Sequence, residues 1–243
     1  MKSSLLTRET VKTPVVQCSL IAACLVLSAS LLLFPDDRTW CVVVTLATIS
    51  LWAEVRIHKL VRRNLIVRRS LKFVPYMLPV TCFGIDLEVH VPATVVATLA
   101  AGAYLIATRR QLQKALDMRL LSLMPKGTAG ERWSETLFFV GSAAAQEYLH
   151  RFVLVTYCTE LGVPGPIVVI ITTATFVAEH FVGPNGHTAR SRSNISLWVG
   201  MSIVFGGVVI LLPPALSAVM LGHCIINAPA AIRPHLRGRS AKS

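Results

Sequence analysis

The amino-acid sequence predicts an all-α protein: a polytopic transmembrane helical bundle of about eight spans, with both termini cytoplasmic. The first observation is the composition, because 53% of the 243 residues are hydrophobic, only 15% are charged and the mean hydropathy is +0.62. A soluble domain carries about a quarter charged residues. The second observation is that apolar stretches reach the ~17–25 residues that a helix needs to cross a bilayer. The third is that positive charge concentrates in alternate loops.

Hydropathy along the chain defines the expected spans. The third is shortened by Pro75 and Pro79, and the last two are divided only by Pro213-Pro214, so the even number of spans depends on these points. The spans cover residues 15–34, 40–55, 72–85, 91–108, 134–157, 164–182, 196–212 and 214–232.

The positions of the charged residues predict the side of the membrane on which each loop lies. The net charge is +12, and by the positive-inside rule the basic loops and both termini are cytoplasmic. Membrane topology and attraction to anionic headgroups therefore explain the excess of basic residues, and we expect no nucleic-acid partner. The basic segments are 2–12, 56–72, 109–132, 190–192 and 233–242, and the acidic residues between them are Asp36, Asp37, Asp86, Glu88 and Glu160.

The chain divides into parts that differ in polar content. The connector carries Leu112, Leu116, Leu120 and Leu123 at helical spacing, which predicts either a helix in the membrane interface or a solvated linker. The expected parts are a four-span N-terminal scaffold over 1–110, a basic interfacial connector over 109–132, a four-span core over 134–232 and a basic cytoplasmic tail over 233–243.

Ionisable residues lie inside the apolar runs of the second half. A charge at bilayer depth costs at least ~2.5–3.5 kcal/mol on insertion scales, so such residues usually face a protein interior or an aqueous cavity and carry function. The residues are Glu147, His150, Arg151, Glu179, His180 and His223.

The fifth span has a charged pair at helical spacing. Glu147 and Arg151 are four residues apart, so they share a helical face on which a carboxylate and a guanidinium can pair. Gln146 and His150 share the adjoining face, and the run 143–145 of alanines allows another helix to approach closely. A buried ion pair that only fixes helix packing would give the same pattern.

The sixth and eighth spans each have a histidine with a partner one turn away. Phe176 precedes His180 by four residues and can pack over its ring, and His223 precedes Asn227 by the same interval, so imidazole and amide face the same direction. A lone intramembrane histidine is most often a satisfied packing residue, so neither motif suffices by itself.

Together the three motifs resemble those of the CPBP family, the Abi-type membrane CAAX endopeptidases and bacteriocin-processing proteins that include the Ras-converting proteases. That family has Glu-Glu-x-x-x-Arg, Phe-x-x-x-His and His-x-x-x-Asn or Asp on successive membrane helices. The resemblance covers roughly residues 134–232 and implies a glutamic-type intramembrane endopeptidase that hydrolyses a membrane-proximal peptide bond. The corresponding motifs here are Gln146-Glu147-x-x-x-Arg151, Phe176-x-x-x-His180 and His223-x-x-x-Asn227.

The resemblance implies roles for these residues. The first glutamate of the family's pair, helped by His180, would deprotonate a water that attacks a peptide carbonyl. His223 and Asn227 would stabilise the oxyanion, and Glu147 would form a supporting ion pair with Arg151. These roles agree with general chemistry, because a base must accept a proton and an oxyanion needs positioned donors.

The chain departs from the family at Gln146, because an amide cannot accept a proton at physiological pH. Glu147 is the replacement base that we favour. His150 is an alternative, since it lies one turn from Gln146 and imidazole suits proton transfer near neutral pH. Glu179 points about 100° away from its neighbour His180 on an ideal helix, which argues against it.

Metal binding is a further alternative. His180, His223 and Glu147 are residue types that bind zinc, but no HExxH motif is present. We therefore expect no cofactor, with zinc left open. The six cysteines lie in apolar segments without CxxC spacing, and we interpret them as packing residues.

The sequence leaves other functions open. A pseudoprotease, which binds a partner or confers immunity without hydrolysis, would explain Gln146. A small transporter or lipid-binding protein would explain the buried ionisable groups. For a protease, we expect a peptide or protein substrate in the lipid bilayer, including lipidated ones. Compact loops without soluble appendages favour a bacterial plasma membrane over an organelle membrane.

Overall fold

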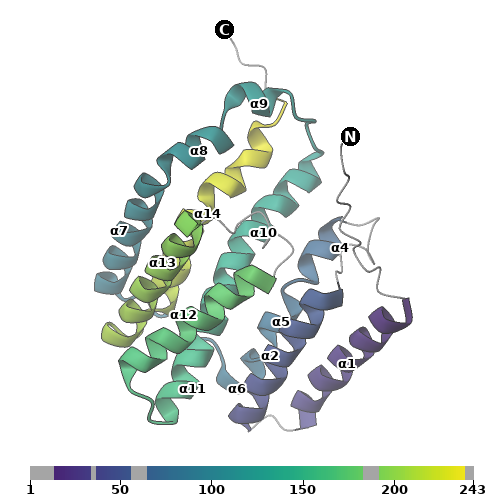
Figure 1. Ribbon diagram of the computed structural model, residues 1–243, viewed down its shortest axis with the longest axis vertical. Helices are drawn as coiled ribbons and strands as arrows, with labels where there is room; N and C mark the ends of the chain where they lie inside the picture. The colour runs from purple at the N-terminus through teal and green to yellow at the C-terminus, as the bar shows by residue number, and fades with distance from the viewer. Residues whose placement is uncertain (1–13, 34–36, 56–64, 183–191, 239–243) are drawn as a thin grey trace, which may run out of the picture.

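A computed structural model describes residues 14–33, 37–55, 65–182 and 192–238 of the chain (Figure 1). Within these ranges every regular element is a helix and no strand occurs, which confirms the all-α prediction. Each apolar segment expected from the sequence contains helix.

The helices follow the order of the expected segments. The N-terminal half contains α1 (Pro14–Leu33), α2 (Arg38–Val55), α4 (Leu65–Ser70), α5 (Val74–Met77), α6 (Val80–Phe83) and α7 (Val91–Ala107). The connector contains α8 (Arg109–Ala115) and α9 (Met118–Ser122). The C-terminal half contains α10 (Ala129–Glu147), the π-helix η1 (Tyr148–Val153), α11 (Leu154–Glu160), α12 (Gly165–Val182), α13 (Arg192–Leu211) and α14 (Leu216–Leu236).

The long helices run up and down the bundle in alternation (Figure 1). At the top of this view lie α9, the start of α10 and the end of α14, whereas α6 and α11 lie at the bottom. Near the top, Glu135 accepts from Arg237 (2.9 Å) and Arg69 (3.3 Å), which ties α10 to the end of α14 and to α4. Near the bottom, Arg38 of α2 pairs with Glu160 of α11. Among the described residues, the basic connector and the end of α14 thus lie at one end of the bundle, and α6 and α11 lie at the other (Figure 1).

The third expected span, residues 72–85, is not one continuous helix. It is divided into α5 and α6 at Leu78 and Pro79. Proline has no N–H to continue the hydrogen-bond ladder, and its ring clashes with the carbonyl four residues earlier. The indole N–H of Trp52 donates to the backbone carbonyl of Leu71 (2.8 Å), so α2 holds this broken segment.

The fifth helix begins at Ala129 rather than near residue 134. The Thr128 hydroxyl accepts from the backbone N–H of Glu131 (3.2 Å), and the Glu131 carboxylate accepts from the backbone N–H of Thr128 (2.8 Å). This capping box satisfies N–H groups that a helix start leaves free. The same backbone N–H, followed by the hydroxyl, holds the pKa of the Glu131 carboxyl below its ordinary value, because both stabilise its charged form.

The length of the apolar helices bears on the membrane prediction. Among the residues that the structure describes, α14 is the one helix that is both long and apolar enough to cross a bilayer, and α7 with its bent continuation would be a second. The count of eight spans therefore stays a prediction. The shorter apolar helices are Cys18–Ala29, Arg38–Trp52, Val74–Phe83, Gly165–His180 and Ile195–Leu211.

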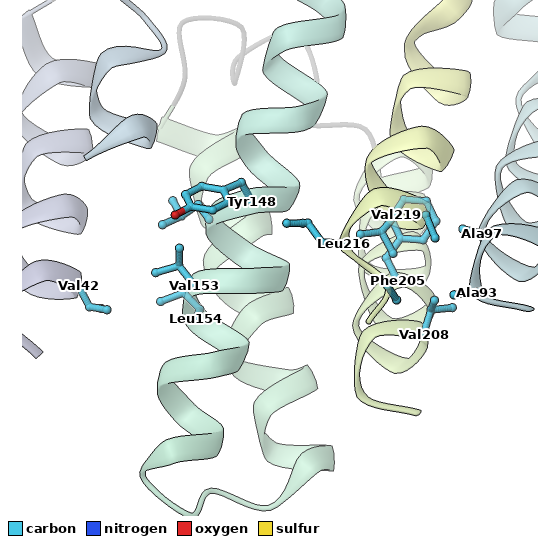
Figure 2. Packing of buried hydrophobic residues seen from close by; sticks show 13 residues of the cluster. Val42, Ala93, Ala97, Tyr148, Val153, Leu154, Phe205, Val208, Leu216 and Val219 are labelled. Atoms are coloured by element: carbon cyan, nitrogen blue, oxygen red, sulfur yellow. The ribbon is translucent and has the colours of Figure 1, made fainter. Parts of the chain in front are cut away.

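Small residues allow α7 and α14 to pack closely. Ala93, Ala97 and Ala101 lie one turn apart on α7 and are fully buried. A Cβ atom at Gly222 of α14 would lie 2.9 Å from the Phe205 ring and 3.1 Å from the Ala97 carbonyl oxygen. Close backbone approach at small residues is typical of helix pairs in membranes. Figure 2 shows Ala93 and Ala97 of α7 in the main apolar cluster, to which α2, η1, α11, α13 and α14 also contribute.

The connector turns away from α7 instead of extending it. The segment Arg109–Ser122, which contains α8 and α9, is bent by 71° from α7. Leu121 is buried, whereas Leu120 and Leu123 of the predicted leucine row are 56% and 83% exposed. These two leucines are therefore available for contacts outside the chain.

Candidate functional site

Glu147 ends α10, and Arg151 lies in the π-helix that follows. Both residues are 1% exposed. Oε2 of Glu147 lies 3.5 Å from Nε of Arg151, so the ion pair predicted from their spacing is confirmed. Short π-helical turns inside α-helices are rare and frequently occur at functional sites. The sequence pattern gave no signal for this one.

His223 of α14 binds the other oxygen of the same carboxylate. Its Nδ1–H donates to Oε1 of Glu147 at 2.7 Å. Removing one partner of a buried ion pair costs far more than removing one partner of an exposed pair, so Arg151 is the group that compensates the buried carboxylate of Glu147. Oε1 of Glu147 is thus hydrogen-bonded, whereas the buried Oε2 faces Arg151 without a hydrogen-bond partner.

Arg151 also joins α12 and α13. Its guanidinium donates to the Ser202 hydroxyl of α13 and to the Thr172 carbonyl of α12 (3.4 Å). The guanidinium lies over the Phe176 ring, 5.4 Å from its centroid. The planar, multiply donating guanidinium suits this setting better than an ammonium would. Sequence reasoning missed Ser202, because the sequence of an apolar span does not distinguish a serine that only packs from one that binds another side chain.

His180 has a defined tautomer when its ring is neutral. Nδ1 lies 2.9 Å from the Phe176 carbonyl, which can only accept, so Nδ1 carries the hydrogen and Nε2 carries the lone pair. The ring packs between Phe176 (4.5 Å between centroids) and Trp198 (4.7 Å). The contact between Phe176 and His180 is the one predicted from their spacing. His180 therefore has an acceptor nitrogen beside its aromatic neighbours.

Side chains from all three motifs line a cavity of about 90 Å³. Its polar lining residues are Glu147, Arg151, Ser202 and residues of the second and third motifs, and the other lining residues are aromatic or aliphatic. At roughly 30 Å³ of liquid volume per molecule, the space suits a few waters or a small chemical group. The lining residues are Tyr104, Glu147, Arg151, Phe176, His180, Trp198, Met201, Ser202, Phe205, His223, Ile226 and Asn227.

Asn227 lies one turn after His223 and also lines the cavity. Its Nδ2 donates to the Phe139 carbonyl of α10 at 3.1 Å. An amide nitrogen carries two hydrogens, so one remains to donate to another group. The helical spacing predicted that imidazole and amide would face the same direction, and both side chains reach the same cavity.

Gln146 and His150 do not line this cavity; they bind Glu179. The Gln146 amide donates to Oε1 of Glu179 (2.7 Å), and Nε2 of His150 lies 2.7 Å from Oε2. The Tyr76 hydroxyl donates to Oε1 (2.5 Å), and Nδ1 of His150 lies 3.2 Å from the Thr175 hydroxyl. The shared face of Gln146 and His150 is thus confirmed. Sequence reasoning missed Tyr76, which lies in the proline-broken third segment and gave no spacing signal.

The zinc alternative finds no support in the geometry. No group of three or more His, Cys, Asp and Glu side chains in the described parts of the chain is arranged to hold a metal ion. In the predicted zinc set, Nδ1 of His180 is bonded to a backbone carbonyl and Nδ1 of His223 to Glu147, which leaves Nε2 of each ring as the nitrogen that a metal would take. The described residues are not arranged as a metal centre, and we derive no step through one.

The chain was compared with protein-family models, with curated proteins and with solved structures. None of these comparisons finds a match.

Proposed function

We propose that this chain is a multi-pass membrane protein of CPBP type whose cavity hydrolyses a membrane-proximal peptide bond. The observation that carries the proposal is the convergence of Glu147, Arg151, His180, His223 and Asn227 on the same cavity. These residues come from motifs far apart in the chain, and ionisable side chains at bilayer depth usually mark a functional site.

The membrane part of the proposal is supported by apolar residues on the outside of the bundle. Soluble monomers rarely expose large contiguous apolar surfaces. Here lipid would cover them, with the basic loops on the cytoplasmic side. The exposed residues include Leu25 on α1, Leu99 and Ile106 on α7, Ile170 on α12, and Ile203 and Leu211 on α13.

His180 is the base that the geometry favours. Oε1 of Glu147 is hydrogen-bonded to His223, and its Oε2 lies 3.5 Å from Arg151 as part of a buried ion pair. The other bases considered, His150 and Glu179, bind each other. Nε2 of neutral His180 can accept a proton from a water as that water attacks the peptide carbonyl. The same nitrogen can then return the proton to the leaving amine.

The oxyanion formed by that attack needs donors in the cavity. The free amide hydrogen of Asn227 and an Nε2–H of His223 are suited to this role. Glu147 supports it by holding Nδ1 of His223 at 2.7 Å, and the doubly protonated ring, in which both nitrogens donate, is the form that takes this role. Glu147 is then a positioning residue.

A binding protein without hydrolytic activity is the second candidate. It is favoured by Gln146, whose amide donates to Glu179 and cannot serve as a base. Such a protein would keep the cavity and bind a peptide without cleaving it.

The test is cleavage of a quenched-fluorescent peptide library with apolar termini, using purified protein in proteoliposomes. We expect cleavage that falls by about 10²–10⁴-fold in His180→Ala, as for loss of a general base. Cys224→Ala is the matched control, because Cys224 neighbours His223 but does not line the cavity. Equal cleavage by His180→Ala and the unmodified protein would refute the site, and binding without cleavage would select the second candidate.

A further inference from the structure

The carboxylate of Glu179 links α12 to three other elements of the bundle. It accepts from Gln146 of α10 and from Tyr76 of α5, and it pairs with His150 of η1. The side chain is only 16% exposed. A buried carboxylate is costly unless it is hydrogen-bonded, and this one is bonded at both oxygens. These bonds therefore oppose rotation of α12 at Glu179.

The donors around Glu179 have fixed directions. An ionised carboxylate only accepts, so the Tyr76 hydroxyl, the amide nitrogen of Gln146 and Nε2–H of His150 must all donate. The Gln146 amide is thereby oriented with its nitrogen toward α12. A carboxylate at position 146 would instead meet Glu179 at 2.7 Å, where two negative charges repel strongly.

His180 follows Glu179 directly, so its direction is set by the same helix rotation. Successive side chains of an α-helix are about 100° apart, and with Glu179 directed at α5 and α10, His180 turns toward α13. There it packs against Trp198 and lines the cavity. Phe176, one turn earlier, contacts the rings of both His150 (5.6 Å) and His180 (4.5 Å).

From this geometry we infer that Glu179 is the positioning residue for His180, and that Gln146 and Glu179 act as a matched amide and carboxylate. The role in catalysis rests on the proposed function, but the effect on the direction of His180 does not. The pairing also means that restoring a glutamate at position 146 requires removal of the carboxylate at 179.

The decisive measurement is a through-space NMR contact between labelled histidine and tryptophan side chains in the full-length protein. His180 and Trp198 give the contact, and its assignment is checked by its loss in Trp198→Phe. We expect Glu179→Ala to lose it while the protein stays folded. If Glu179→Ala does not fold, Tyr76→Phe and Glu179→Gln are the milder variants, and we expect both to weaken the contact.

A variant in which the amide and the carboxylate change places between positions 146 and 179 distinguishes the positioning role from general packing. Gln146→Glu alone is expected to lose the contact between His180 and Trp198. Gln146→Glu combined with Glu179→Gln is expected to restore it, because the amide at position 179 then donates to the carboxylate at position 146. Cleavage should follow the contact, with about 100-fold loss where His180 is misplaced by 1 Å.

Failure of this inference is distinguishable from failure of the proposed function. A contact that persists in Glu179→Ala, or that the double exchange does not restore, overturns the positioning role. A contact that behaves as expected in a protein that never cleaves supports the positioning role and removes the enzymatic function.

Discussion

The Nδ1 atom of His223 lies 2.7 Å from Oε1 of Glu147, although 76 positions separate the two residues in the chain. Arg151 lies 3.5 Å from the other carboxylate oxygen. Carboxylate, guanidinium and imidazole thus form a buried unit that joins α10, η1 and α14. Because charges in such a unit compensate one another away from water, removal of one member should be far more costly than removal of an exposed ion pair.

Replacing Arg151 by methionine tests this compensation. The substitution leaves the Glu147 carboxylate buried without its cation, and we expect the free energy of unfolding to fall by about 3–5 kcal/mol. The measurement is reversible denaturant unfolding in detergent micelles. Arg38→Met is the control, because the side chains of Arg38 and Glu160 are each 44% exposed, and such a pair contributes about 1 kcal/mol or less. Equal losses in both variants would contradict the buried unit.

Asn227→Leu tests the oxyanion donor. It removes the amide that lies in the cavity one turn from His223, and we expect kcat to fall by about 10²–10³-fold, as for loss of one donor to an oxyanion. KM should change little, because the lost bond forms mainly in the transition state. The bond to the Phe139 carbonyl is lost as well, so thermal unfolding of the variant is the control for folding. A rise in KM at constant kcat would assign Asn227 to substrate binding instead.

The capping box predicts a pH dependence at the start of α10. The folded-state pKa of Glu131 is lowered from its ordinary value of 4.5, so its contribution to stability is present above that value and is lost as the pH falls through the lowered pKa. The midpoint of thermal unfolding should therefore be higher in the unmodified protein than in Glu131→Gln at neutral pH. The difference should shrink below about pH 4. A difference that is the same at both pH values would contradict the capping role.

The sequence predicted what depends on local spacing. The pair Glu147 and Arg151 and the contact of Phe176 with His180 follow from the position of a side chain four residues along a helix. The site also rests on contacts between distant segments. The roles of Ser202 and Tyr76 can be recognised only in the packed structure. Spacing within one segment does not predict which face of a helix contacts which neighbouring helix.

The π-helix at Tyr148–Val153 had no signal in the apolar pattern, and neither did the start of α10 at Ala129. The capping residues Thr128 and Glu131 are visible in the sequence but were not used in the prediction, which relied on hydropathy, and hydropathy locates apolar segments and not helix ends. Pro79 was recognised as shortening the third segment, and the structure shows that it breaks the helix.

The approach of α7 to α14 predicts opposite effects for two glycine-to-alanine substitutions. At Gly222 the added Cβ would lie 2.9 Å from the Phe205 ring and 3.1 Å from the Ala97 carbonyl oxygen, so the helices must separate, at a cost of about 1–3 kcal/mol. At Gly102 of α7 nothing lies within 4 Å of the added atom, and alanine there should stabilise the protein by about 0.4–1 kcal/mol by restricting the unfolded chain. Unfolding of both variants under the same detergent conditions measures the contrast. If Gly222→Ala proves as stable as Gly102→Ala, the small residues do not set the distance between the helices, and the cavity beside Phe205 is shaped by other contacts.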